Sequence, residues 1–249
     1  MRVIVTRPAA QAAAWVEQLQ ARGIDAVALP LIGIAPAADA GAVVSAWKRL
    51  AAHQLVVFVS PNAVEEFFAL RPSDVEWPDG TLAGSVGPGS TQALIRHGVP
   101  RNLIAEPAAE SEQFDSEGLW RELESRNWQG SAVLIVRGDG GREWLADTLR
   151  AQGAEVSFVA AYRRVVPALD SPMLDGAIAR PSAHLWFFSS SEAIANLQAE
   201  RPTQDWSAAL AIATHPRIAE RARDCGFGVV RECPPTLEAV VACIQSFAS

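Results

Sequence analysis

The chain has 249 residues, which is enough for one large domain or two of ordinary size. Its formal net charge of −7 argues against a protein that binds nucleic acid through general electrostatics, and an acidic ligand would need local positive groups. The chain has a single lysine, Lys48, and twenty arginines, so a lysine-dependent phosphate loop or Schiff base is difficult to place, whereas guanidinium groups suit carboxylates.

A strand pattern, "RVIVT", follows Met1 directly, without the features of a signal peptide. The longest apolar runs, such as 55–59, are too short to cross a bilayer, so we expect a cytoplasmic protein. The cysteines lack a C-x-x-C pair and are expected to be reduced, half-buried thiols: Cys225, Cys233 and Cys243.

Six times along the chain, a short apolar run ends in a small or polar turn, and a helical pattern follows. The six runs lie at 3–8, 55–63, 83–91, 133–143, 185–193 and 210–219. Second strands without such turns lie at 25–30, 102–107, 155–162 and 228–233. Further helical patterns cover the segment from Ala12 to Gly23, the segment from Ser111 and Gln113 to Trp128, and Arg142 to Gln152. This alternation predicts an α/β fold with parallel sheets and helices on both faces.

Two stretches, 30–41 and 162–172, interrupt this rhythm and are interpreted as interdomain connectors. Two strands alone cannot form a stable domain. We therefore expect residues 1–35 to join 168–249 in one discontinuous α/β domain, with 38–162 as an inserted α/β domain. A single large sheet is the alternative layout.

The six turns are candidate anion sites. In open α/β sheets, ligands bind beyond the carboxyl ends of the strands, where helix N-termini offer unpaired backbone N–H groups. Simple helix capping explains any single turn without a ligand. The turns contain Thr6-Arg7, Ser60–Asn62, Gly87–Thr91, Arg137–Arg142, Ser189–Ser191 and Thr214–Arg217.

Other chemistry has weak support in the sequence. "GPGSTQ" lacks the third glycine of a dinucleotide fingerprint, and "GDGGRE" has it misplaced. The four histidines and three cysteines show no metal spacing, and no Gly-x-Ser-x-Gly elbow is present. Tyr162 is the only tyrosine, and we expect it to face the space between the domains. A phenol is protonated at neutral pH and can donate to a departing hydroxyl, although an amphipathic interface residue is an equal explanation.

The ordered set "VIVTRP", "LPLIGIAP", "VVFVSPNAVEEFF", "SVGPGSTQAL", "VLIVRGDGGREWLADTL", "GAEVSFVAAYRRV" and "LWFFSSSEAIANL" resembles the uroporphyrinogen-III synthase family over essentially the whole chain. The resemblance implies two α/β domains joined by a two-stranded connector. It also implies a lyase that expels water from linear hydroxymethylbilane and closes the ring with the last pyrrole inverted, in a cleft between the domains. No metal or cofactor is implied.

The resemblance also assigns roles to residues. Tyr162 matches a tyrosine proposed to assist loss of the hydroxyl, and the eight substrate carboxylates would be bound at the turns. The implied substrate-binding residues are Arg7, Ser60, Gly87, Ser90, Arg137, Gly138, Arg142, Ser189 and Arg217. The chain departs from the family at "HPRIA", 215–219, where many members have Gly-Pro-Thr-Thr-Ala, so the threonine contact is either lost or replaced, with Arg217 as the candidate replacement.

We expect a monomer with no nucleic-acid or membrane partner and a transient contact with the preceding enzyme of the pathway. The alternative function is a non-catalytic two-domain binder or regulator of an acidic small molecule. A nucleotide-dependent enzyme is disfavoured by the missing lysine and glycine.

Overall fold

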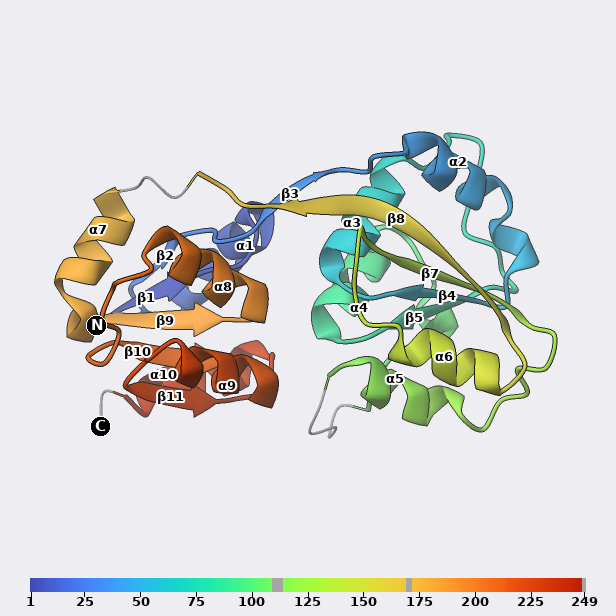
Figure 1. The fold of residues 1–249 in the computed structure, drawn as a ribbon. Helices are drawn as coiled ribbons and strands as arrows, with labels where there is room; N and C mark the ends of the chain where they lie inside the picture. Colours follow the sequence, from blue (N-terminus) through green and yellow to red (C-terminus); the bar gives the residue numbers. More distant parts are fainter. Residues whose placement is uncertain (109–113, 169–171, 248–249) are drawn as a thin grey trace. The chain divides into compact units, whose positions relative to one another are not determined.

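The computed structural model describes residues 1–108, 114–168 and 172–247, in which the chain divides into two compact units (Figure 1). Unit 1 is Met1–Gly33 with Val165–Ser249, and unit 2 is Ile34–Arg164. Each unit has its own sheet, so the alternative of a single large sheet is wrong.

Unit 1 is built on a five-stranded parallel sheet. Its strands, in the order in which they lie side by side, are β11 (Val229–Glu232), β10 (Leu210–Ala213), β9 (His184–Phe188), β1 (Arg2–Val5) and β2 (Ala26–Ala28). Its helices are α1 (Ala9–Gln20), α7 (Pro172–Ala179), α8 (Ser191–Glu200), α9 (Pro216–Asp224) and α10 (Leu237–Gln245), with a 3₁₀ turn at Pro181–Ala183.

Successive residues of a strand point to opposite faces of the sheet. Because consecutive residues of these strands are apolar, both faces of the sheet are apolar. Val5 of β1 packs with Leu19 of α1 and Val240 of α10. On the other face, the rings of Trp186 and Phe188 in β9 stack with their centroids 6.0 Å apart. Covering of both faces explains why the strands read as continuous apolar runs.

Unit 2 has a sheet of six strands. In their order of adjacency they are β3 (Gly33–Pro36), β8 (Glu155–Val165), β7 (Ala132–Gly138), β4 (Leu55–Phe58), β5 (Leu82–Ser85) and β6 (Ile104–Ala105). The four pairings from β8 to β6 are parallel. The helices are α2 (Ala40–Lys48), α3 (Pro61–Ala69), α4 (Pro88–Arg96), α5 (Ser116–Leu123) and α6 (Trp144–Ala151), with 3₁₀ turns at Leu50–Ala52 and Arg101–Leu103.

The two faces of this sheet carry different helices. Phe58 of β4 packs with Phe67 of α3 in a cluster that also includes α2 and α4. The neighbouring Val57 points the other way and packs with Leu119 of α5 and Leu149 of α6. The expected α/β architecture, with helices on both faces of mostly parallel sheets, is confirmed.

The chain passes between the units in two adjacent strands, β3 and β8, as a two-stranded connector requires. The strands approach closely: a Cβ added to Gly33 would lie 2.7 Å from Cγ2 of Val165. The sequence placed the connectors at 30–41 and 162–172. The first stretch contains β3 and the start of α2, and the second contains the end of β8, while 169–171 lie outside the described residues.

The helix expected from Ser111 to Trp128 is shorter in the structure. Ser111 and Gln113 lie outside the described residues, and α5 begins at Ser116 after an Asp115 cap. It ends at Leu123, whose carbonyl accepts a hydrogen bond of 3.0 Å from the indole Nε1 of Trp128. The same carbonyl also accepts from the Arg126 N–H at 3.1 Å, so the side chain of Trp128 adds a second hydrogen bond at the end of the helix.

Candidate active site

Three adjacent strands of each unit end in the turns predicted as anion sites. In unit 1, β10, β9 and β1 lead to α9, α8 and α1. In unit 2, β7, β4 and β5 lead to α6, α3 and α4. Because parallel strands end at the same edge of a sheet, each unit gathers three helix N-termini at one edge, where backbone N–H groups can bind anions.

A hydrogen bond joins Ser60, at the end of β4, to Tyr162 in β8. The Ser60 Oγ lies 3.1 Å from the Tyr162 OH, and it also accepts from the Ala63 N–H at 3.1 Å as the cap of α3. Tyr162 is 0% exposed and packs in the core cluster of unit 2 with Phe58 and Val136. The expectation that this side chain faces open space is therefore wrong in this structure.

The packing of the Tyr162 ring explains why position 138 is a glycine. Gly138 pairs with Tyr162 between β7 and β8, next to a register shift at Arg137. A Cβ at Gly138 would lie 3.1 Å from two atoms of the Tyr162 ring. The glycine therefore allows the ring to approach the backbone of β7, a packing role that the sequence did not reveal.

The arginines that flank this turn differ in how fully they are paired. Arg137 forms an ion pair with Glu143, with 3.3 Å between Nη2 and Oε1, and its Cζ lies 4.0 Å from the centre of the Phe158 ring. Its buried Nη1 has no hydrogen-bond partner among the described residues. Arg142 is ion-paired with Glu117 of α5. A glutamate thus balances the charge of each arginine, and among the described residues Arg137 keeps one donor without a partner.

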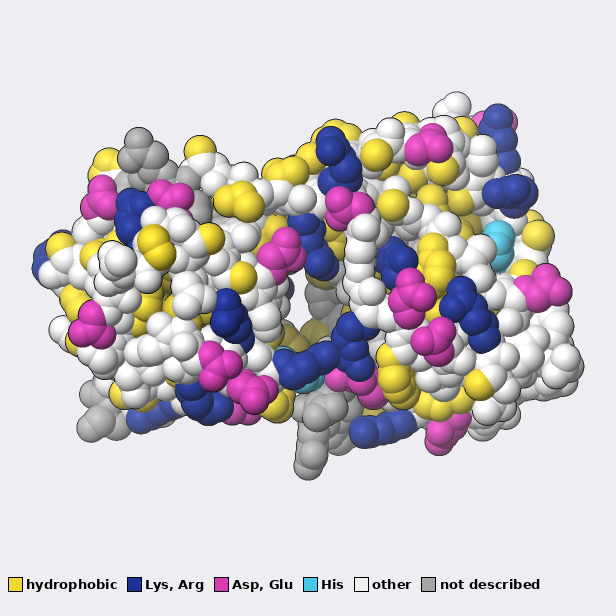
Figure 2. All heavy atoms as spheres, viewed as in Figure 1, with side chains coloured by type: hydrophobic (Ala, Val, Ile, Leu, Met, Phe, Trp, Pro, Cys, Tyr) yellow, Lys and Arg dark blue, Asp and Glu magenta, His cyan; other side chains and the backbone are white. Residues whose placement is uncertain are grey.

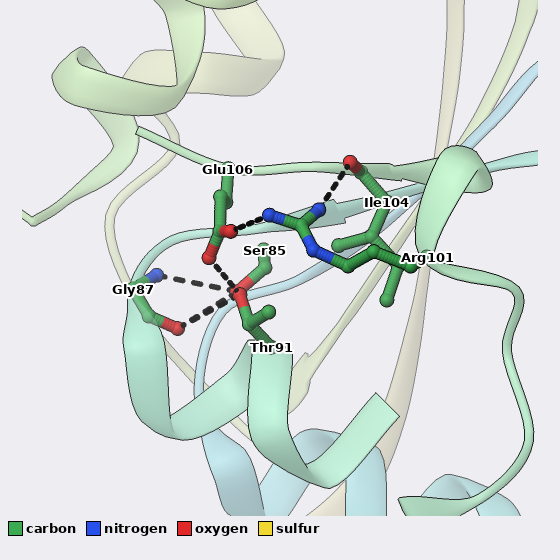
Figure 3. A network of polar contacts seen from close by, with 6 residues as sticks. All are labelled: Ser85, Gly87, Thr91, Arg101, Ile104 and Glu106. Atoms are coloured by element: carbon green, nitrogen blue, oxygen red, sulfur yellow. Dashed lines mark hydrogen bonds and ion pairs between the residues drawn. The ribbon is translucent and has the colours of Figure 1, made fainter. Parts of the chain in front are cut away.

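The turn before α4 rests on a buried polar network (Figure 3). Gly87 caps the helix, and its carbonyl accepts from the Ser85 Oγ at 2.9 Å. The Thr91 Oγ1 donates to Ser85 at 2.9 Å or to the carboxylate of Glu106. Ser90 is also buried, in the first turn of α4.

Glu106 links this network to Arg101. Its second carboxylate oxygen is ion-paired with Arg101, which also donates to the Ile104 carbonyl at 3.3 Å (Figure 3). Thr91 belongs to the predicted turn Gly87–Thr91, whereas Glu106 was not among the predicted residues. The available signal was an acidic residue directly after the short second strand "NLIA", at the same sheet edge as Gly87.

Arg7 is the less exposed of the two predicted arginines of unit 1. Its guanidinium lies over two rings, 5.0 Å from the centre of Trp15 and 5.6 Å from that of Phe187, and it reaches the Gln11 Oε1 at 3.4 Å. The buried Nε has no hydrogen-bond partner in the described part of the chain. Burial lowers the pKa of Arg7 to about 10, because desolvation disfavours the charged form. An anion at this position would restore the lost solvation.

The other two turns of unit 1 are organised by residues that the prediction did not select. Ser190, rather than Ser189, caps α8, with its Oγ accepting from the Glu192 N–H at 3.2 Å. His215 caps α9, with its Nδ1 accepting from the backbone N–H of Arg217 at 3.1 Å. The histidine thus takes the capping role that small hydroxyl residues usually have.

The guanidinium of Arg217 is exposed and has no ion-pair partner within residues 1–108, 114–168 and 172–247. Figure 2 shows positive and negative side chains interspersed on the face in view. On this face, positive charge comes from individual side chains among acidic ones rather than from a broad positive patch.

In the described ranges, no three His, Cys, Asp or Glu side chains gather into a group that could hold a metal ion. None of the helices that the structure describes is both long and apolar enough to cross a membrane.

A sequence model of the family described as "Uroporphyrinogen-III synthase HemD" matches residues 13–242. Uroporphyrinogen-III synthase of Salmonella typhimurium is 34% identical over 171 residues, which are 68% of this chain and 68% of that protein. The Escherichia coli enzyme of the same name is 35% identical over 167 residues, covering 66% of this chain and 65% of its own length.

Solved structures show the same fold at lower sequence identity. A mutant uroporphyrinogen III synthase of Thermus thermophilus superposes with a TM-score of 0.62 at 15% identity, covering 100% of this chain and 97% of the other. Uroporphyrinogen-III synthetase of Helicobacter pylori gives a TM-score of 0.56 at 17% identity, covering 99% of both chains. At these identities the structural likeness supports the fold alone.

Proposed function

The chain belongs to the uroporphyrinogen-III synthase family, and on that premise we propose which of its residues carry out the reaction. It is a lyase of porphyrin and heme biosynthesis. It cyclises linear hydroxymethylbilane to uroporphyrinogen III with loss of water and inversion of the terminal pyrrole ring. The observation that carries this conclusion is the family match over 13–242, which includes residues of both units.

The enzyme has to control which isomer forms more than how fast the ring closes. The bilane loses its hydroxyl readily, and the resulting electrophile closes head to tail without inversion when nothing directs it. The enzyme has to favour attack through the substituted carbon of the terminal ring. Holding reacting atoms in one geometry can supply several kcal/mol of such a preference, so binding residues are expected to be central to this mechanism.

We propose that the substrate carboxylates are bound at the strand ends of both sheets. Arg7 supports this role most clearly in unit 1, because its buried Nε lacks a partner among the described residues. Arg217 and Ser189 would add a charge and a hydroxyl at the neighbouring turns. In unit 2 the helix N-termini at Ser60 and Gly87 offer backbone N–H groups.

Other assigned residues of unit 2 differ in the support they have. The buried Nη1 of Arg137 has no hydrogen-bond partner in the part of the chain that the structure describes, which favours a direct contact with a carboxylate. Arg142 would first have to leave Glu117. We propose that the buried Ser90 and Gly138 shape the turns that they belong to.

We propose that Tyr162 assists departure of the substrate hydroxyl by donating a hydrogen bond from its phenol. In this structure the phenol oxygen is hydrogen-bonded to the Ser60 Oγ, at 3.1 Å. The step therefore requires that the phenol exchange its bond with Ser60 for one with the substrate. Ser60 is only half-buried, so the pair extends from the core toward the edge where α3 begins.

The remaining proposals concern the molecule's surroundings. We propose a cytoplasmic monomer that binds neither nucleic acid nor membrane and that contacts the preceding pathway enzyme transiently. The net charge of −7 supports the absence of a nucleic-acid partner.

The test of the activity is to generate hydroxymethylbilane in situ with the enzyme that makes it, add this protein, and separate the oxidised porphyrin isomers. We expect the type III isomer to dominate. A reaction without the protein is the control and should give the type I isomer by spontaneous closure. Type I alone in the presence of folded protein would favour the alternative of a non-catalytic binder.

A further inference from the structure

Helix α4 begins differently from helix α3 of the same unit. The N-cap of α3 is Ser60, whose hydroxyl accepts a hydrogen bond from the Ala63 N–H at 3.1 Å. The N-cap of α4 is Gly87, which has no side chain to accept such a bond, and Pro88 follows it without an N–H. The conformation at the start of α4 therefore depends on contacts from other residues.

Ser85 and Thr91 supply these contacts. The Ser85 Oγ donates to the Gly87 carbonyl at 2.9 Å and accepts from the Gly87 N–H at 3.3 Å. The Thr91 Oγ1 lies 2.9 Å from the Ser85 Oγ. Both residues are buried, so loss of a partner would leave a hydroxyl without a hydrogen bond where water cannot replace it.

Within the described residues, the turn 87–91 keeps one backbone N–H for a ligand. The N–H groups of Ser90 and Thr91 both bond to the Gly87 carbonyl, at 3.0 and 3.2 Å. The Gly89 N–H has no acceptor in the part of the chain that the structure describes. Because Gly89 lies between residues that are held by these hydrogen bonds, the direction of its N–H depends on them.

Glu106 extends this chain of contacts to β6 (Figure 3). β6 pairs in parallel with β5, with Gly84 opposite Ala105. The residues that follow this pair, Ser85 and Glu106, therefore leave the sheet at the same edge. One carboxylate oxygen of Glu106 accepts a hydrogen bond from the Thr91 hydroxyl, since a carboxylate can only accept.

The second oxygen of Glu106 is ion-paired with Arg101, which also donates to the Ile104 carbonyl at 3.3 Å. This ion pair orients the carboxylate toward Thr91. It also balances a negative charge at the edge where an acidic substrate is proposed to bind. Both carboxylate oxygens are engaged with protein groups, which favours a role of Glu106 through the turn rather than by contact with the substrate.

We propose that Glu106 is a positioning residue for the cyclisation. Through Thr91 and Ser85 it holds the turn 87–91, so that the Gly89 N–H keeps one direction toward a substrate carboxylate. Arg101 keeps the Glu106 carboxylate in place and balances its charge. This inference rests on the proposed function, because it takes this turn to be part of the substrate site.

The first experiment compares Glu106→Ala with Glu106→Gln in the isomer-resolved turnover assay. Alanine removes both contacts, whereas the glutamine amide can still accept from Arg101 and donate to the Thr91 hydroxyl. We expect KM to rise about tenfold in Glu106→Ala and less than about threefold in Glu106→Gln, with kcat changed less than about threefold in both.

Glu76→Ala is the matched control for this experiment. It removes the acidic partner of an ion pair with Arg71 elsewhere in unit 2 and should leave KM unchanged. An unaltered KM in folded Glu106→Ala would overturn the proposal. An equal rise in Glu106→Ala and Glu106→Gln would also overturn it, because charge rather than the hydrogen-bonded chain would then be responsible.

The second experiment tests whether Glu106 acts through Thr91. Thr91→Val removes the hydroxyl with little change in volume and should raise KM about as much as Glu106→Ala, whereas Thr91→Ser keeps the hydroxyl and should change KM less than about threefold. The double variant of Thr91→Val and Glu106→Ala should lie within about threefold of either single variant, because both interrupt one chain of contacts. A double variant whose rise is the product of the single rises would contradict the proposal. If Glu106→Ala does not fold, Thr91→Val with Thr91→Ser as its control decides the matter.

The third measurement needs no turnover and so separates this inference from the proposed function. Amide hydrogen exchange in peptides that cover 87–91 should be at least about tenfold faster in Glu106→Ala than in the unaltered protein, while β1 and β9 of unit 1 keep their protection. Unchanged exchange in the turn would overturn the positioning role even in an active enzyme. Type I isomer alone from the unaltered protein would instead reject the proposed function. Circular dichroism of each variant checks that the fold is retained.

Discussion

The residue that unites most of the observations in unit 2 is Tyr162. Its hydroxyl binds the cap of α3, its ring fills the space beside Gly138, and its exposed fraction is zero. Its position near the carboxyl end of a strand could be predicted from the sequence. Its depth could not, because burial depends on the aromatic cluster that α2 and α3 bring to the same face of the sheet.

The variant Tyr162→Phe tests the catalytic assignment. It keeps the ring that packs against Gly138 and removes only the hydroxyl. We expect kcat to fall by roughly 100-fold, the scale of general acid catalysis, while the free energy of unfolding falls by about 1 kcal/mol for the lost hydrogen bond. Isomer-resolved turnover and urea unfolding measure the two effects.

Ser60→Ala is the matched control, because it removes the same hydrogen bond and leaves the phenol in place. Its main effect should be on KM, with kcat lowered less than about tenfold. If both variants lose the same kcat, the hydroxyl of Tyr162 has a structural role only.

Gly138→Ala should destabilise the chain. The new Cβ would lie 3.1 Å from the buried Tyr162 ring, which has no room to move aside, so we expect a loss of about 1–3 kcal/mol in the free energy of unfolding. Gly140→Ala is the control, since a Cβ there meets nothing within 4 Å. Equal denaturant midpoints for the two variants would show that the strand relaxes around the new methyl group.

At the scale of the elements, the turns that begin the helices are suited both to capping the helix and to binding an anion. Capping alone explains Ser60, Ser190 and His215, whose side chains accept backbone hydrogen bonds at the starts of α3, α8 and α9. A capped helix still has unpaired N–H groups in its first turn, so capping and anion binding are compatible. The sequence identified the turns correctly because proline and small polar residues mark helix starts. It could not tell which of two successive serines, Ser189 or Ser190, would be the cap.

A charged link between α3 and α4 predicts a pH effect. Glu65 binds Arg96 and the His97 ring at 2.7 Å each. Burial acts to raise the pKa of Glu65, but the hydrogen bonds from His97 and Arg96 outweigh it and the pKa is lowered. A lowered folded-state pKa means that the stabilisation is present above the pKa of the unfolded chain and is lost as pH falls through that of the folded one.

Glu65→Gln should therefore cost about 0.5 kcal/mol at neutral pH, as partly exposed ion pairs do, and progressively less at acidic pH, as the carboxyl of the folded chain is protonated. Glu66→Gln is the neighbouring control with the opposite sign, because burial and Glu65 raise the pKa of Glu66, and its removal should not destabilise at neutral pH. Urea unfolding at neutral and acidic pH measures both. A cost for Glu65→Gln that is independent of pH would exclude the charged link.

At the scale of the whole molecule, the chain consists of two units with separate cores. Leu19 belongs to the cluster between the unit 1 sheet and α1, whereas Leu94 belongs to the cluster between the unit 2 sheet and α4. Both side chains are fully buried. The cores have no residue in common among these clusters, so each unit should respond to its own substitutions.

Leu19→Ala should lower the stability of unit 1 by about 2–5 kcal/mol, and amide exchange should accelerate in β1 and β9 while β4 and β7 stay protected. Leu94→Ala should give the reciprocal pattern. Mass-spectrometric hydrogen exchange under native conditions resolves the strands. Equal acceleration in both sheets from either substitution would mean that the units unfold as one.

The sequence by itself determined the order of the elements, the α/β class, the interruptions at which the chain changes unit, and the turns that begin the helices at the strand ends. These features follow from local spacing, because apolar runs, helix starts and the glycines that end helices can be recognised from neighbouring residues. Only the tertiary structure decided that Tyr162 is buried against Gly138, that Glu117 neutralises Arg142, and that Arg7 keeps a buried donor without a partner among the residues that the structure describes. Those contacts join side chains that are distant in the sequence and meet only when sheets and helices pack. The spacing of residue types along the sequence does not specify them.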